Sequence, residues 1–599
     1  MNLNRIPFAI TVALLPAFAL VLGSGMAHAA TDAATDAGAV SEKVAPGPSP
    51  IGNYLAGRHA QASRDMEAAL TYLNAALLAM PDVPDLRRRT FILQVIEGHI
   101  KVALPLAKQL IADNPKAPIA NLVLAVDALQ RGDMKGVRRY FEKGAERGLN
   151  SFTGPLLSAW SLAAAKNKKA AIEAMAPLAA NEATKGLHDV HNALLLDFLD
   201  DPEAAAAYDG VVKGSLGGSF RIVQHIGGYF ERHGQPDKAR RIYDKMKEDL
   251  PGTTLLEGVD ARMKAGKKPK KLLRTARDGA AEALFSIANS LRRQQARETA
   301  LVLVRLALHL RPDFSMALVL TADILEDDQR PDDANAIYAR VDPASPFRLP
   351  ADLSRARNLD TLKRTDAAIA VYRELAKRRA ADPEPVTQLG NLFRRHERWP
   401  EAIEAYSEAM KRIGTLQQRH WRLLYARGIA LERAKRWPES EKDFLKALAF
   451  EPEQPFVLNY LGYSWIDQGL NLERAQDMIR RAVKLRPNDG FIIDSLGWGY
   501  YRVGKYEEAA IELERAVEIR PQDPVINDHL GDAYWRVGRK LEARFQWHRA
   551  LSLDPDKEVA ARVREKLKSG LGEPDPLPAS AKETPQKAPT APAPILNKT

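Results

Sequence analysis

The chain has 599 residues, 45% hydrophobic and 27% charged, which are ordinary values for a globular protein and leave room for several domains. Its formal net charge of +11 favours acidic partners or anionic surfaces over long range. The sequence contains no cysteine, which excludes disulfides, thiolate metal sites and a cysteine nucleophile.

The first residues have the pattern of an export signal. Met1–Arg5 carries one positive charge, residues 6–22 are largely apolar, and Ala27-His28-Ala29 has the small-x-small pattern of a signal peptidase site. The alternative is a retained membrane anchor, but two prolines interrupt the apolar run, which is short for a bilayer core of about 30 Å. We therefore expect residues 1–29 to be a cleaved signal peptide, with no cysteine after it for a lipid anchor.

A repeat is visible in the C-terminal third. Pro487, Pro521 and Pro555 are each 34 residues apart, and each closes a segment of one design. One copy reads Leu496-Gly497, Tyr500, Ala509, Leu513, Ala516 and Pro521, and the next copy has Leu530-Gly531, Tyr534, Ala543, Trp547, Ala550 and Pro555 at the same offsets. The spacing predicts two antiparallel helices that approach closely at the small residues. Each pair exposes an apolar face that only the next pair can cover.

The small residue of the first helix, here called the anchor, can be followed through most of the chain. The anchor position recurs at Gly57, Phe91, Ala125, Ala159, Ala193, Gly227 and Ala261, then at Ala288, Ala322, Ala356, Gly390, Gly428, Gly462, Gly497 and Gly531. Phe91 departs from the small-residue rule, and we expect a looser helical pair there. These positions predict about fifteen helical pairs in an all-α solenoid.

These motifs resemble the tetratricopeptide repeat (TPR) family. The resemblance implies a right-handed superhelix whose first helices line a concave groove that binds peptides or partner domains. The last three repeats, with Leu461-Gly462-Tyr463, Leu496-Gly497-Trp498 and Leu530-Gly531, are similar to bacterial periplasmic adaptors that recruit and activate a carboxyl-terminal processing protease.

The pattern divides the chain into segments. After the signal peptide we expect a flexible segment at 30–50, an N-terminal array at 51–253, an irregular basic helical pair at 254–287, a C-terminal array at 288–567 and a disordered Pro/Ala-rich tail at 568–599. A boundary between the two arrays is expected near the basic stretch, because residues 262–277 hold eight Lys and Arg.

The expected groove lies in the last three repeats. First-helix positions six and three before the anchor, and one and four after it, share one helical stripe. They select Phe456, Asn459, Tyr463 and Ile466, then Phe491, Asp494, Trp498 and Tyr501, then Val525, Asp528, Asp532 and Trp535. Aromatic side chains of this kind suit recognition. The alternative is that some of them pack between neighbouring first helices.

Two charged features qualify this prediction. Asp494, Asp528 and Asp532 would favour a basic ligand, which could be the chain's own tail with Lys582, Lys587 and Lys598. Lys267, Lys268, Lys270 and Lys271 form a basic patch that is either simply solvated or binds anionic lipid, cell-wall polymer or polysaccharide.

No catalytic or cofactor motif is present. The sequence has no His-Glu-x-x-His, no phosphate-binding glycine loop and no Gly-x-Ser-x-Gly. His188 and His191 share a helical face, but without a third ligand they are expected to be surface residues. We expect no metal, no cofactor and no enzymatic activity. The expected partners are proteins rather than nucleic acid, and the two candidate roles are a periplasmic adaptor and a component of an envelope secretion or polysaccharide-export assembly.

Overall fold

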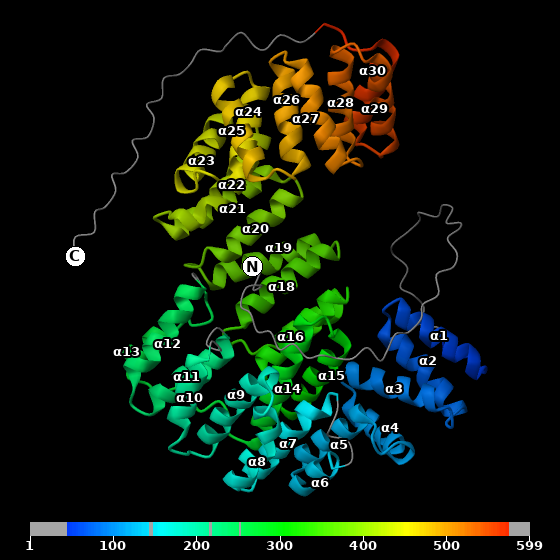
Figure 1. The fold of residues 1–599 in the computed structure, drawn as a ribbon, viewed down its shortest axis with the longest axis vertical. Helices are drawn as coiled ribbons and strands as arrows, with labels where there is room; N and C mark the ends of the chain where they lie inside the picture. The colour runs from blue at the N-terminus through cyan, green and yellow to red at the C-terminus, as the bar shows by residue number, and fades with distance from the viewer. Residues whose placement is uncertain (1–44, 143–147, 215–218, 251–252, 574–599) are drawn as a thin grey trace. The chain divides into compact units, whose positions relative to one another are not determined.

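The computed structural model describes residues 45–142, 148–214, 219–250 and 253–573 (Figure 1). Within these ranges the regular structure is helical and contains no β-strand, which confirms the all-α class. The chain divides into two compact units, unit 1 up to Ala368 and unit 2 from Ile369. None of the described helices is both long and apolar enough to cross a membrane. The expected signal peptide lies outside the described residues.

Unit 1 is built from consecutive helical pairs and one short unpaired helix. Its helices are α1 (Pro50–Ala62), α2 (Met66–Ala79), α3 (Pro84–Ile96), α4 (Ile100–Asp113), α5 (Pro118–Arg131), α6 (Met134–Arg139), α7 (Asn150–Ala164), α8 (Lys168–Ala179), α9 (Glu182–Phe198), α10 (Ala204–Lys213), α11 (Phe220–Arg232), α12 (Pro236–Asp249), α13 (Val259–Lys264), α14 (Ala276–Arg293), α15 (Arg297–Leu310), α16 (Ser315–Asp327), α17 (Pro331–Ala339) and α18 (Arg348–Thr361).

The division between the units falls within α19 (Thr365–Arg378). Unit 2 continues with α20 (Glu384–Arg395), α21 (Trp399–Ile413), the short 3-10 helix η2 (Gln418–His420), α22 (Trp421–Arg433), α23 (Trp437–Phe450), α24 (Pro455–Asp467), α25 (Leu472–Leu485), α26 (Gly490–Arg502), α27 (Tyr506–Ile519), α28 (Pro524–Arg536), α29 (Lys540–Ser552) and α30 (Lys557–Ser569). The described helices give six pairs in α1–α12 and eight in α14–α29, close to the expected number.

The anchor residues bring the two helices of a pair into close contact. A Cβ placed on Gly497 would lie 2.6 Å from Cγ of Leu513, and one on Gly531 would lie 2.5 Å from Cδ1 of Trp547. Both distances are too short for a carbon contact. A larger residue at the anchor of these two pairs would therefore push the helices apart. Turns between the helices use Gly504 and similar residues at positive φ.

Unit 1 departs from a simple stack because α14 and α15 pack against the first helices of earlier pairs. Helix α14 contacts α7 and α9, and α15 contacts α3 and α5 (Figure 1). Nearly every residue of α15 from Ala300 to Leu310 is buried, as expected for a helix enclosed on all sides. In α14, a Cβ on Gly279 would lie 2.2 Å from the ring of Trp160, so the two helices touch through a glycine. The first-helix face of α3–α9 is thus covered by the chain itself.

Buried charges hold this arrangement together. Glu282 of α14 is 2% exposed and accepts a hydrogen bond from Nε of Arg221 at 2.8 Å. Burial alone would raise the pKa of Glu282, but Arg221 and His225 lower it well below its ordinary value, so the carboxylate stays charged. A second ion pair joins the start of α17 to the end of α3, where Arg330 donates to both carboxylate oxygens of Glu97 at 2.8 Å. Such a two-point contact fixes the direction of approach as well as the distance.

The region expected to be an irregular helical pair has a different structure. Ala261 is exposed on the short helix α13, and no second helix completes a pair with it. Residues 265–275, which we call the basic strap, are non-helical and lead into α14. The boundary expected there is not where the chain divides, because α14 and α15 bury their surfaces against the helices that precede the strap.

The prediction of surface histidines is wrong for His191. This side chain is fully buried and packs edge-on to Trp160, while His188 lies 2.9 Å from Asp189. Burial lowers the pKa of His191 to about 4, so the ring is neutral at neutral pH. His191 belongs to the buried interface that α14 forms with α7 and α9.

Replacing Gly279 by Ala is expected to destabilise unit 1 by about 1–3 kcal/mol, because the new methyl group overlaps Trp160. The matched control is Gly210→Ala in α10, where a Cβ would meet nothing within 4 Å and helix propensity favours Ala. Urea unfolding followed by circular dichroism compares the two. Equal midpoints for both variants would contradict the close α14–α7 contact.

Candidate functional site

Three first helices of unit 2, α24, α26 and α28, carry the residues that sequence analysis assigned to a groove. Each first helix packs on its own second helix, and α26 also contacts α24 and α28. The residues therefore fall into rows, one from each repeat, and the rows have different environments.

The row three positions before the anchor lies between neighbouring helices. Nδ2 of Asn459 donates to Oγ of Ser495 at 3.2 Å, and Asp494 lies 2.9 Å from Nδ1 of His529. Asp494 is 8% exposed and Asp528 is fully buried. These side chains join one first helix to the next, which is the alternative that sequence analysis left open.

Two of the expected groove carboxylates bind a cation from the chain's own last helix. Nζ of Lys566, on α30, lies 2.7 Å from Asp528 and 2.7 Å from Asp532. Asp532 also accepts a hydrogen bond from Nε1 of Trp547 at 2.9 Å. Burial raises the pKa of Asp532 above its ordinary value, against the opposing effect of Lys566. The expectation that these carboxylates are open to a basic ligand is therefore not met, because Lys566 already occupies them.

The lysines of the tail, Lys582, Lys587 and Lys598, lie outside the described residues. The basic group that meets the acidic pair comes instead from an ordered helix. Sequence reasoning could have found Lys566, since it stands 34 residues after Asp532 and thus at the same position of the next repeat step.

Three stacked rings lie across α26 and α28. Trp498 stacks on Tyr501 of the same helix, with centroids 4.8 Å apart, and on His529 of the next, at 4.1 Å. Burial lowers the pKa of His529, but Asp494 and then Asp528 and Asp532 more than offset this, and the net pKa is raised. Trp498 and Tyr501 remain half-buried, so part of each ring is open to a partner. The sequence pattern did not suggest His529, because its role depends on the neighbouring helix.

Trp535 lies at the end of the repeat array. Its ring is 5.3 Å from that of Trp547, and Nζ of Lys540 lies 3.8 Å from its centroid. A Cβ on Gly570, just after α30, would come within 2.1 Å of it. Trp535 therefore supports the turn that follows α30 and is less open than expected.

The remaining predicted residues differ in exposure. Ile466 is buried, while Tyr463 and Val525 are half-buried, and burial raises the pKa of the Tyr463 hydroxyl to about 12. Phe456 and Phe491, near the starts of α24 and α26, are 38% and 49% exposed. Such exposure is unusual for phenylalanine and marks these two positions as candidate contact residues.

In unit 1, the four predicted basic-patch lysines divide into two pairs. Lys268 donates to the backbone oxygen of Arg232 at 2.9 Å, and Lys271 bonds Asp200 at 2.7 Å and the oxygen of Phe198 at 3.2 Å. These two hold the strap to the C-terminal ends of α11 and α9. Lys267 and Lys270 are exposed, and their side chains make no hydrogen bond or ion pair with any residue that the structure describes.

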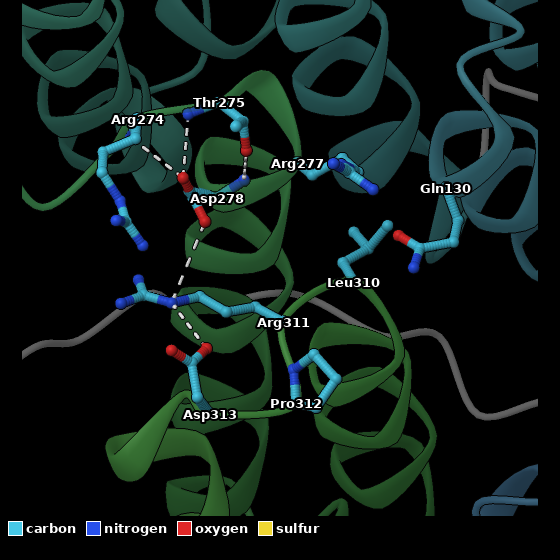
Figure 2. Close-up of a pocket in the computed structure, with 9 residues that line it drawn as sticks. All are labelled: Gln130, Arg274, Thr275, Arg277, Asp278, Leu310, Arg311, Pro312 and Asp313. Atoms are coloured by element: carbon cyan, nitrogen blue, oxygen red, sulfur yellow. Dashed lines mark hydrogen bonds and ion pairs between the residues drawn. The ribbon is translucent and has the colours of Figure 1, made fainter.

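A pocket adjoins the end of the basic strap (Figure 2). Its lining residues are Gln130, Arg274, Thr275, Arg277, Asp278, Leu310, Arg311, Pro312 and Asp313. Figure 2 shows Arg274 and Arg311 extending to the same side of Asp278. Asp278 accepts hydrogen bonds from the backbone N–H groups of Arg274 and Thr275, which makes it part of the N-terminal cap of α14. The lining contains three arginines and two aspartates, so its net charge is positive.

The described residues contain no cluster of three or more His, Asp or Glu side chains that could hold a metal ion.

Two segments of unit 2 match family models. Residues 387–455 match the model described as tetratricopeptide repeat, and residues 499–538 match the model described as TPR repeat. Unit 2 therefore contains tetratricopeptide repeats. Repeats of this kind are protein-interaction scaffolds, and the observed stack of helical pairs agrees with them.

Two curated relatives share part of the sequence. A TPR repeat-containing protein of Pseudomonas aeruginosa is 32% identical over 188 residues, which is 30% of each chain. The Hsp70-Hsp90 organizing protein of Triticum aestivum is 25% identical over 166 residues, 27% of this chain and 28% of that protein. The chain thus matches less than a third of the length of either relative.

Two solved structures align with most of this chain at low identity and low TM-score. The alignment with a chain of the Cut9–Hcn1 structure covers 88% of this chain and 97% of that chain, with 14% identity and a TM-score of 0.35. The alignment with yeast Tom70 covers 87% of this chain and 95% of the Tom70 chain, with 14% identity and a TM-score of 0.29.

Lys566→Met is expected to lower the opening free energy of α30 by about 3 kcal/mol, because it removes the cation that bridges two buried carboxylates. Asp532 then has no cation, and Asp528 keeps only the longer contact with Arg562 at 3.4 Å. Adding Asp532→Asn should restore part of this loss. Hydrogen exchange of the α28 and α30 amides measures both changes.

The control for this pair is Lys568→Met, on the exposed side of α30. Equal exchange in the Lys566 and Lys568 variants would show that the buried ion pair contributes nothing to the docking of α30.

Proposed function

We propose that this protein is a non-catalytic scaffold that binds other proteins through the first helices of unit 2. The observation that carries the proposal is the half-buried ring stack of Trp498, Tyr501 and His529, together with the exposed Phe456 and Phe491. Aromatic rings bury much area at little entropic cost, and here their supporting polar groups are already paired within the protein.

The proposed binding surface belongs to unit 2, because the corresponding surface of unit 1 is occupied. Helices α14 and α15 cover the first helices α3, α5, α7 and α9. A partner segment could enter there only by displacing a buried helical pair. Unit 2 has no such internal cover over α24 and α26 among the described helices, and only its last repeat is covered by α30.

We further propose that the scaffold works in the bacterial periplasm, after removal of residues 1–29. The apolar stretch and the Ala27-His28-Ala29 pattern support export. The specific role that we favour is recruitment or activation of an envelope protease or cell-wall hydrolase. The alternative is a structural part of an envelope secretion or polysaccharide-export assembly. The name of the Triticum aestivum relative, an organizing protein for two other proteins, agrees with a scaffold role.

A photocrosslinking amino acid at position 498 is expected to capture a specific envelope protein in living cells. The matched control places it at position 511 on α27, where Ile511 is 61% exposed on a second helix. Mass spectrometry of the crosslinks identifies the partner, and N-terminal sequencing of the periplasmic fraction tests cleavage after Ala29.

A protease or hydrolase captured only from position 498 supports the adaptor role, whereas an outer-membrane barrel captured there supports the assembly role. The same products from both positions, or a chain that stays in the cytoplasm, would refute the proposal.

A second candidate function is binding of an anionic envelope surface through the basic strap. Lys267, Lys270, Arg274 and Arg277 are exposed, and no ion pair engages their side chains within the described part of the chain. Two of them, Arg274 and Arg277, line the pocket of Figure 2, whose lining has a net positive charge. Charges without internal partners are free to interact with an anionic surface.

Changing Lys267, Lys270, Arg274 and Arg277 to Gln is expected to reduce binding to phosphatidylglycerol vesicles at least tenfold, since each basic residue contributes about 1 kcal/mol near an anionic surface. The control variant changes the exposed Lys101, Lys108, Lys116 and Lys135, which removes the same charge elsewhere in unit 1. Vesicle co-sedimentation at low and at 0.15 M salt, roughly the physiological ionic strength, measures the effect. Equal losses in the two variants would leave only non-specific attraction.

A further inference from the structure

Exposed aromatic rings of unit 2 pair with arginines at one edge of the first helices. The Cζ atom of Arg486 lies 4.9 Å from the centroid of Phe456, and that of Arg520 lies 4.8 Å from the centroid of Phe491. The next repeat towards the N-terminus has Arg422 at 5.2 Å from the ring of Trp421. We call these three pairs the aromatic–arginine ladder.

Two pairs of the ladder follow from the repeat, whereas Arg422 directly follows Trp421 within α22 and Glu451 stands at the end of α23. Trp421, Phe456 and Phe491 are 35 residues apart, each at the start of a first helix. Arg486 and Arg520 each directly follow the last residue of a second helix, so the turn that ends a pair places a cation over the ring that begins it. The ladder stops in the following repeat, where Val525 and Asp554 occupy the equivalent positions.

The arginines of the ladder have unused hydrogen-bonding capacity. Within the described residues, no hydrogen bond or ion pair engages the guanidinium groups of Arg422, Arg486 or Arg520. All three are exposed. A guanidinium on an aromatic ring keeps its N–H edge free, and that edge fits a carboxylate.

Three acidic residues of the turns before α24, α26 and α28 have partners of their own. Oδ1 of Asp489 accepts the backbone N–H of Phe491 at 3.2 Å, and Oδ1 of Asp523 accepts that of Val525 at 2.9 Å. Glu453 pairs with Arg481. Asp494, Asp528 and Asp532 are buried with their own partners, so these carboxylates do not engage the arginines of the ladder.

We infer that the ladder binds an extended acidic polypeptide segment, with apolar side chains against the rings and carboxylates on the arginines. This inference rests on the proposed scaffold function and adds the chemistry of the partner. Helices that contact each other lie about 8–10 Å apart, and an extended chain advances about 3.3 Å per residue, so neighbouring rungs meet every third residue. The partner therefore carries its acidic and apolar residues with a period of three.

The test uses the mature full-length chain and a fluorescent peptide of four Leu-Glu-Ser repeats. Two further peptides replace every Glu by Gln or by Lys. The charge variant is Arg486→Gln with Arg520→Gln, and the ring variant is Phe456→Ala with Phe491→Ala. The matched control, Lys442→Gln with Lys446→Gln, removes the same charge from exposed positions of α23. Fluorescence anisotropy gives the affinities, and circular dichroism verifies the helical content.

The expected result is binding of the Glu peptide that weakens at least tenfold in the charge variant and in the ring variant, but not in the control. The Gln and Lys peptides should bind at least tenfold more weakly than the Glu peptide. Equal affinity for all three peptides, no binding of any of them, or an unchanged affinity of the charge variant would overturn the inference.

The scaffold function is judged separately by the crosslinks from position 498. If those crosslinks capture a partner while the peptide test fails, the scaffold proposal stands and only the acidic specificity is lost. If the crosslinks also fail, both proposals fall.

Discussion

The structure depends on one contact, the close approach of the two helices of each pair at the anchor. In unit 2 the anchor is a glycine, and the space that a methyl group would need is filled by Tyr406, Phe444, Leu513 or Trp547 from the second helix. Because the helices meet so closely there, their remaining apolar residues face the next pair. Each pair is then stabilised mainly by its contacts with the adjacent pairs, as in other repeat proteins.

The same rule explains why unit 1 is not an open array. Helix α15 is buried on nearly all sides, and the middle of α14 is buried as well, so the pair is stable only where other helices surround it. The first helices α3 to α9 provide that environment, and the contacts of Glu282 with Arg221 and of Arg330 with Glu97 fix the pair in one orientation. One consequence is functional, since a surface that other repeat proteins could offer to a partner is used here for folding.

In unit 2 the polar residues of the first helices serve the stack. Asp494 with His529 and Asp528 with Lys566 link one repeat to the next, so that α30 ends the array by neutralising two carboxylates. Trp498 rests on this paired layer through His529 and stays half-buried. The unpaired arginines at the helix ends then set the charge of the surface. Binding chemistry and array stability are thus divided between different rows of the same helices.

The sequence by itself determined the all-helical repeat, its period and nearly every anchor, because small residues at a fixed spacing are a local requirement of helix packing. It also located the exposed rings Phe456 and Phe491, whose position within a helix suffices to turn them outward. Only the tertiary structure decided that Asp528 and Asp532 are buried beneath Lys566, that His191 is internal and that α14 lies against α7 and α9. Those outcomes depend on which distant segment covers a given face, and periodicity along one helix carries no information about its neighbours.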